Sequence, residues 1–67
     1  MTTLRFSNIS DDTTIGHVTM TNDGLKYDNE AVKTIMSGRV AQLGEERAFA
    51  LANGWSNGYV ASRPITT

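Results

Sequence analysis

Threonine and apolar residues alternate around Val18 and Met20, and this is the clearest pattern of hydrophobic and polar positions in the chain. The alternation resumes over residues 25–27, so their leucine and tyrosine are expected on one face and the intervening lysine on the other. A period of two is typical of a half-buried strand. Between the two runs lies Asn22-Asp23-Gly24, a turn sequence whose glycine adopts positive φ at little cost. The pattern therefore predicts a β-hairpin over residues 17–27.

A helical spacing of apolar residues begins after the hairpin. The residues at positions i, i+3 and i+4 are Val32, Ile35 and Met36. Asp28 is a suitable N-cap, because its side chain can accept a hydrogen bond from the first turn. The spacing predicts a helix over residues 29–37 that stops at Gly38. Val40 and Leu43 continue the same register, so extension through the glycine remains an alternative, at a cost of about 1 kcal/mol relative to alanine.

A second helix is predicted over Glu45–Ala52, and Gly44 separates it from the first. Two glutamates lie in its first turn, where the helix dipole favours negative charge. Its alanines allow close packing against a neighbouring element, and the following Asn53-Gly54 is a typical helix end.

Both ends of the chain contain shorter strand signals. Leu4–Phe6 alternates apolar with charged residues and is expected to form an edge strand, followed by a loop over the polar residues 7–14. Residues 56–58 predict a turn or bulge that leads into a last strand over residues 59–61. Pro64 is expected to end this strand, because proline has no backbone N–H.

The length of 67 residues corresponds to one domain with a thin core, since a chain this short buries only about 60% of its unfolded surface. We expect four sections, which are an N-terminal strand and polar loop (1–14), the hairpin (15–28), a helical region (29–54) and a C-terminal strand (55–64). A small antiparallel sheet, made of the hairpin and one or two short strands, buries every apolar stripe if two helices pack on one face. The predicted fold class is therefore α+β.

Composition restricts the class of protein further. The chain has no cysteine, which excludes disulfides and cysteine-ligated zinc. Its net charge is −1 and its six basic residues are scattered, so we expect no nucleic-acid partner. No segment has the roughly 20 apolar residues of a membrane helix, and the polar start predicts no secretory signal peptide. We therefore expect no membrane association and no secretion by a signal peptide.

Candidate catalytic chemistry is sparse in the sequence. The single histidine is His17, and no serine lies in a Gly-x-Ser-x-Gly motif that would supply a nucleophile. The carboxylate pairs Asp11-Asp12 and Glu45-Glu46 are adjacent in sequence, so the side chains of each pair point in different directions. The prediction is that the protein is not an enzyme and has no catalytic residues, cofactor, metal site or small-molecule substrate.

The segment 54–59, Gly-Trp-Ser-Asn-Gly-Tyr, is the most distinctive in the chain. Its tryptophan can be a core anchor, because a thin core needs large apolar side chains. It can instead belong to a recognition surface, since Trp and Tyr dominate interface hot spots. A base-stacking platform is a third alternative, disfavoured by the lack of a basic groove in the sequence. The candidate protein-contact residues are Phe6, Trp55, Asn57, Tyr59 and Arg63.

The hairpin over residues 18–27, the helical region and the ending over residues 54–60 resemble small uncharacterised proteins of actinobacteria and their phages. The resemblance implies a phage or prophage accessory protein, located in a virion or in the host cytoplasm. It implies no activity and no binding site. Sparse chemistry and low charge agree with a non-enzymatic protein–protein interaction module, expected to be a phage-encoded structural accessory such as a minor capsid or capsid-decoration protein. Its expected partner is a protein or a second copy of the chain, contacted through the chain ends, 2–7 and 65–67. The alternative is a small phage or bacterial regulatory protein that binds a host protein and inhibits or redirects it.

Overall fold

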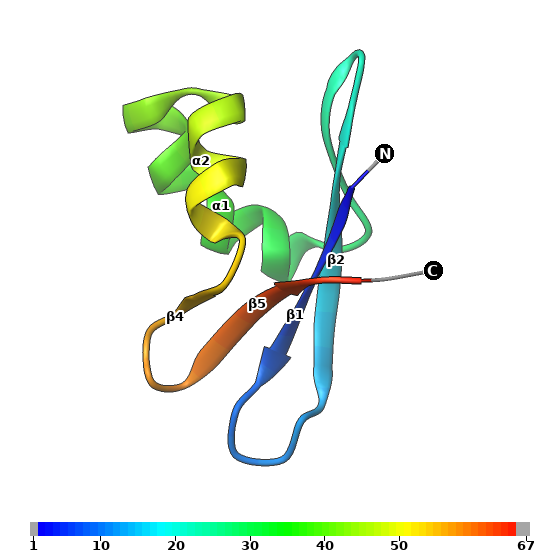
Figure 1. Cartoon of the computed structure of the whole chain (residues 1–67), viewed down its shortest axis with the longest axis vertical. Helices are drawn as coiled ribbons and strands as arrows, with labels where there is room; N and C mark the ends of the chain where they lie inside the picture. The colour runs from blue at the N-terminus through cyan, green and yellow to red at the C-terminus, as the bar shows by residue number, and fades with distance from the viewer. Residues whose placement is uncertain (1, 66–67) are drawn as a thin grey trace.

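A computed structural model describes residues 2–65 of the chain (Figure 1). The elements follow the order β1 (Thr3–Asn8), β2 (Thr14–Thr21), β3 (Gly24–Tyr27), α1 (Glu30–Leu43), α2 (Glu45–Ala52), β4 (Trp55–Ser56) and β5 (Val60–Pro64). The strands form one antiparallel sheet in the order β3-β2-β1-β5-β4. The prediction of an edge strand over Leu4–Phe6 is wrong, because β1 pairs with β2 on one side and with β5 on the other. The predicted α+β class is confirmed, and the sheet has five strands where the sequence indicated a hairpin and one or two more.

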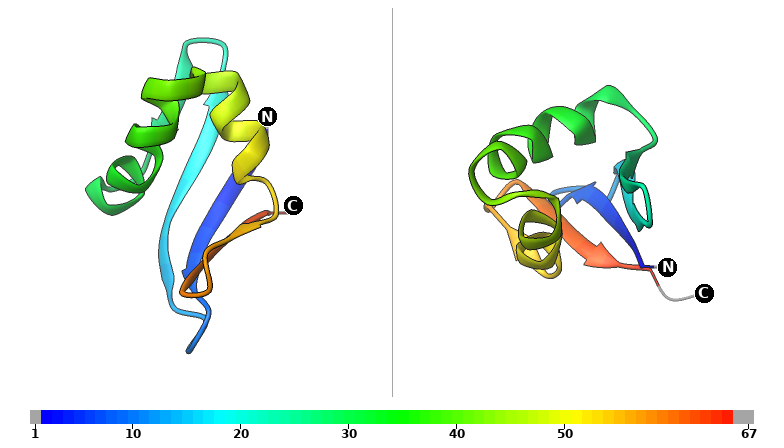
Figure 2. Two further views of the ribbon diagram at one scale, coloured as in Figure 1. Left: turned by 90° about the vertical axis from the view of Figure 1, so that its left-hand side faces the viewer. Right: turned by 90° about the horizontal axis from the view of Figure 1, so that it is seen from above.

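Both helices lie on the same face of the sheet (Figure 2). The core between these two layers consists of Leu4, Phe6, Val18, Leu25, Val32, Met36, Ala48, Phe49 and Ala52. The core residues of β1 are two positions apart, because successive side chains of a strand point to opposite faces. Within the described residues no helix covers the other side of the sheet, which we call the open face (Figure 2).

The predicted hairpin is present as β2 and β3. Met20 pairs with Leu25 and Val18 with Tyr27, so the apolar residues of both strands share the helix-covered face. Gly24 has φ 112° where the turn enters β3, as expected for a residue without a Cβ. The period-two pattern therefore predicted correctly which side chains of these two strands face the helices.

The first helix continues through Gly38, so the predicted stop at this residue is wrong and the alternative of extension is correct. Val40 lies beyond the glycine and packs against the core, and this burial offsets the cost of a helical glycine. The helix ends instead at Gly44, whose φ of 84° and ψ of 166° lie in a region open mainly to glycine. The second helix then spans the predicted range.

The N-cap of α1 is Asn29, which corrects the prediction of Asp28. The Asn29 side chain accepts a hydrogen bond from the backbone N–H of Val32 at 3.1 Å. Gly16 on β2 lies so close that a Cβ at this position would be 2.7 Å from side-chain atoms of both Asp28 and Asn29. The absence of a Cβ at Gly16 therefore lets the start of α1 lie close to the sheet. Asp28, which is not the N-cap, contacts β2 instead.

The last strand, β5, ends at Pro64, so the predicted end of the strand at this proline is confirmed, although the strand begins at Val60 and not at the predicted residue 59. The backbone N–H of Ile65 donates to the Thr3 carbonyl at 2.9 Å. Because backbone groups alternate along a strand, the Pro64 nitrogen faces away from β1, and β4 does not extend far enough to pair with it. The lack of an N–H at Pro64 therefore removes no hydrogen bond from the sheet. The two-residue strand β4 pairs Trp55 with Ser62, and the sequence pattern did not predict it.

A side chain from α2 occupies the outer edge of β3. The Glu45 Oε2 atom accepts a hydrogen bond from the backbone N–H of Leu25 at 2.8 Å. A Cβ at Gly24 would be 2.9 Å from the same carboxylate. Burial raises the pKa of the Tyr27 phenol, and the negative charge of Glu45 raises it further. The second helix is thus attached to the sheet edge through one carboxylate.

Candidate functional site

A row of charged residues crosses the open face of the sheet. In the β1–β5 pairing Arg5 is directly opposite Arg63, and in the β1–β2 pairing it is opposite His17. Asp28 follows β3 and holds the histidine at the far end of the row. The row therefore brings together residues from both ends of the chain and from the hairpin.

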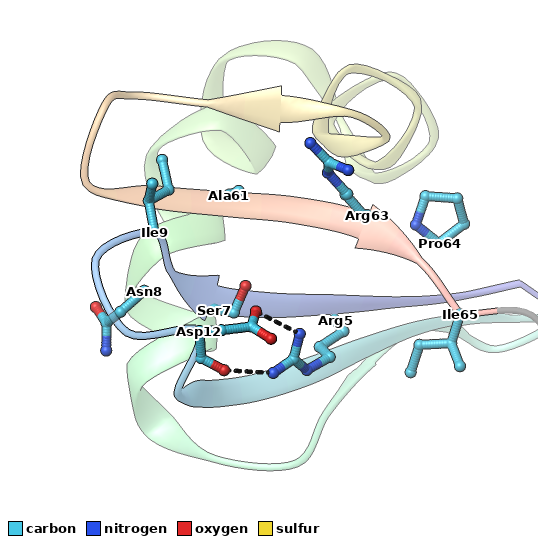
Figure 3. Close-up of a pocket in the computed structure, with 9 residues that line it drawn as sticks. All are labelled: Arg5, Ser7, Asn8, Ile9, Asp12, Ala61, Arg63, Pro64 and Ile65. Atoms are coloured by element: carbon cyan, nitrogen blue, oxygen red, sulfur yellow. Dashed lines mark hydrogen bonds and ion pairs between the residues drawn. The ribbon is translucent and has the colours of Figure 1, made fainter.

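A cavity of about 480 Å³ lies over the β1–β5 side of this row (Figure 3). It is lined by Arg5, Ser7, Asn8, Ile9, Asp12, Ala61, Arg63, Pro64 and Ile65. Two arginines and one carboxylate supply its charge, while its aliphatic side chains come from the β1–β2 loop and the end of β5. Ile9 is 48% exposed and Ile65 is 38% exposed, so the apolar part of the lining is open to contact.

Arg5 closes the loop between β1 and β2. Its Nη1 atom lies 3.2 Å from Asp12 Oδ1, and its Nη2 atom donates to the Asp12 carbonyl at 2.7 Å (Figure 3). Its Nε atom donates to Thr14 Oγ1 at 2.7 Å. Asp12 has φ 60°, a left-handed conformation that a short polar side chain tolerates and that these contacts hold in place. All three nitrogens of this guanidinium are therefore engaged within the domain.

Arg63 differs from its cross-strand neighbour, because its side chain is exposed and makes no ion pair with residues 2–65. Like charges placed directly opposite each other in a sheet repel. The Asp12 carboxylate neutralises Arg5, and the charge of Arg63 is left uncompensated within the described part of the chain. The cavity therefore has one fixed, neutralised arginine and one available arginine.

His17 and Asp28 form a close pair at the other end of the row. The Asp28 carboxylate accepts from the backbone N–H of His17 at 2.8 Å and lies 2.7 Å from its Nδ1 atom. The backbone hydrogen bond lowers the pKa of Asp28, and the side-chain hydrogen bond to the imidazole lowers it further. Within residues 2–65 the imidazole has no hydrogen-bonded hydroxyl that could act as a nucleophile.

The predicted contact residues have different surroundings in the structure. Phe6 is fully buried in the core, so it is corrected from a contact residue to a core residue. The half-buried ring of Trp55 lies 6.3 Å from the Phe6 ring, and the Arg39 guanidinium covers it at 4.6 Å. This position matches the interpretation of the tryptophan as a core anchor that retains some exposed surface.

Asn57 and Tyr59 lie in the turn between β4 and β5. The Asn57 side chain accepts hydrogen bonds from the backbone N–H groups of Tyr59 at 2.9 Å and Val60 at 2.8 Å, so it shapes the turn. Tyr59 is 81% exposed, and its carbonyl accepts from the backbone N–H of Ile9 at 2.9 Å. The turn therefore adjoins the β1–β2 loop that lines the cavity.

The sequence predicted Arg63 as a contact residue and the chain ends, 2–7 and 65–67, as contact segments, but it did not predict that Arg5, Ile9 and Ile65 line one cavity with Arg63. Their proximity depends on the pairing of β1 with β5, which joins the two ends of the chain. The alternation in Leu4–Phe6 was the signal that could have placed Arg5 on the face opposite the core. Thr66 and Thr67, predicted as contacts with the other chain-end residues, lie outside the described residues.

Among residues 2–65 no cluster of three or more His, Asp or Glu side chains is arranged to hold a metal ion. In the same part of the chain, neither helix has the length and apolar character needed to cross a membrane. Comparison of the chain with protein-family models, with curated proteins and with solved structures gives no match.

Proposed function

We propose that this domain is a non-enzymatic protein–protein interaction module and that it serves as a phage-encoded structural accessory, a minor capsid or capsid-decoration protein. The observation that carries this proposal is the open face of the sheet, which has a cavity with both aliphatic and polar lining residues and an arginine that makes no ion pair within residues 2–65. Exposed apolar side chains next to polar ones are typical of protein contact surfaces. The resemblance of the hairpin and the Gly-Trp-Ser-Asn-Gly ending to small proteins of actinobacteria and their phages motivates the phage assignment.

The distribution of exposed apolar residues also supports contact through this side of the molecule. Tyr59, Ile9 and Ile65 are all substantially exposed and lie on or beside the open face. Tyrosine is enriched at interface hot spots, because its rigid ring supplies contact area and its hydroxyl supplies a hydrogen bond. In the helix layer, the large apolar residues that are exposed are Leu43 and Leu51.

The test is sedimentation of the purified protein with assembled particles of the phage that encodes it, after its mass alone has been measured by light scattering. A structural accessory is small in isolation and co-sediments with particles in many copies per particle. If the protein stays in the supernatant and instead co-purifies with one host protein at fixed stoichiometry, the structural proposal fails and a regulatory protein replaces it.

A further inference from the structure

We infer that the cavity on the open face binds an extended segment of the partner protein that has a carboxylate side chain followed two residues later by an aliphatic one. This inference rests on the proposed function, because it names the chemistry of the partner at that surface. The carboxylate pairs with Arg63, and the aliphatic side chain packs on Ile65.

Charge complementarity supports the carboxylate. Arg63 is exposed, lines the cavity and has no ion-pair partner within residues 2–65, whereas Arg5 beside it is held by Asp12. A guanidinium forms two parallel hydrogen bonds to a carboxylate, which gives both attraction and direction.

Strand geometry supports the spacing of two residues. Arg63 and Ile65 both line the cavity and are two positions apart, as expected for side chains on one face of a strand. An extended partner segment has the same period, so its residues i and i+2 face the sheet together. Ile9 extends the aliphatic surface on the β1 side of the cavity, and it is 48% exposed.

The same cavity is less suited to a nucleic-acid backbone. A phosphate chain presents repeated negative charges and is bound by clusters of lysine and arginine. Here one arginine is already neutralised by Asp12, and the remaining lining is largely aliphatic or neutral polar. A segment with an isolated carboxylate between apolar side chains fits these contacts better than a polyanion does.

The experiment measures fluorescence anisotropy with three labelled probes. The first is the peptide Val-Thr-Glu-Thr-Val, the second has glutamine in place of its glutamate, and the third is a single-stranded oligothymidine. We expect the glutamate peptide to bind best and Arg63→Gln to weaken it about tenfold, the effect of losing one charge-assisted pair. Lys33→Gln is the matched control, because it removes the same charge from an exposed position of α1 in the helix layer.

Equal binding of the glutamate and glutamine peptides, or equal weakening by both variants, would overturn the inference. Tighter binding of the oligothymidine than of the peptide would overturn it in favour of nucleic acid. Sedimentation of both variants with phage particles separates the two proposals. If Arg63→Gln sediments as well as the wild type, the open face is not the docking surface, although the structural function stands. If the wild type fails to sediment but its binding to the glutamate peptide depends on Arg63, the phage function fails and the acidic-segment site stands.

Discussion

Replacement of Gly38 by alanine is expected to stabilise the domain. This glycine lies in the interior of α1 with helical backbone geometry, and a Cβ placed on it meets no atom within 4 Å. Alanine therefore adds no clash, and it removes the entropic cost of a helical glycine, which is about 0.5–1 kcal/mol. For a domain of this size that gain raises the melting temperature by about 2–8 °C. Thermal unfolding followed by circular dichroism at the helix band measures the shift.

Gly44→Ala is the matched control, because a Cβ at this position also meets no atom within 4 Å. The two sites differ in backbone conformation, since Gly44 has φ 84° and ψ 166° between the helices. An alanine there is strained by about 1–3 kcal/mol, so the melting temperature is expected to fall. A destabilising Gly38→Ala, or stabilisation by both variants, would refute the reasoning that α1 is continuous and that Gly44 ends it.

Three further substitutions test separate contacts. Ser62→Ala is expected to raise the free energy of unfolding by about 1 kcal/mol in urea denaturation, because the Ser62 hydroxyl is buried without a hydrogen-bond partner among residues 2–65; a loss of stability would contradict this. Arg39→Ala is expected to cost about 0.5–1 kcal/mol and to shift Trp55 fluorescence to longer wavelength, because the guanidinium covers the ring; unchanged emission would count against that contact. Asp28→Asn is expected to destabilise near neutral pH, because the pKa of Asp28 is lowered by its hydrogen bonds to His17. The ionised Asp28 carboxylate stabilises the fold above about pH 4, and this contribution is lost as the pH falls through its lowered pKa. The difference in unfolding free energy between the variant and the wild type is therefore expected to be smaller in urea denaturation near pH 3 than near pH 7.

The elements that were predicted correctly have strong local signals. The hairpin follows from the alternation around Val18 and Met20, and α2 has the bounds Glu45–Ala52 that its flanking glycines indicate. The stop at Gly38 was wrong because the packing of Val40 against the core outweighs the propensity of one glycine. Strand β4 has no local signal, since two residues become a strand only by pairing with β5.

The candidate site depends on contacts between distant parts of the chain, which a single sequence does not encode locally. The exposed residue Arg63 was predicted as a contact, but its position opposite Arg5 follows from the pairing of β1 with β5. Phe6 was wrongly predicted as a contact residue, because the sequence alone does not distinguish an aromatic residue of the core from one at an interface. The hydrogen bond between Asp28 and His17 likewise requires the register of the hairpin and the close approach permitted by Gly16.

The hydrogen bond from the Leu25 N–H to the Glu45 carboxylate affects how copies of this domain can be arranged in an assembly. An outer strand with free backbone groups can recruit the same strand of another copy and extend into a fibre. Here a side chain occupies the edge of β3, and the opposite outer strand, β4, has only two residues. Neither edge offers a long template for a further strand, so crowding many copies side by side does not fuse their sheets.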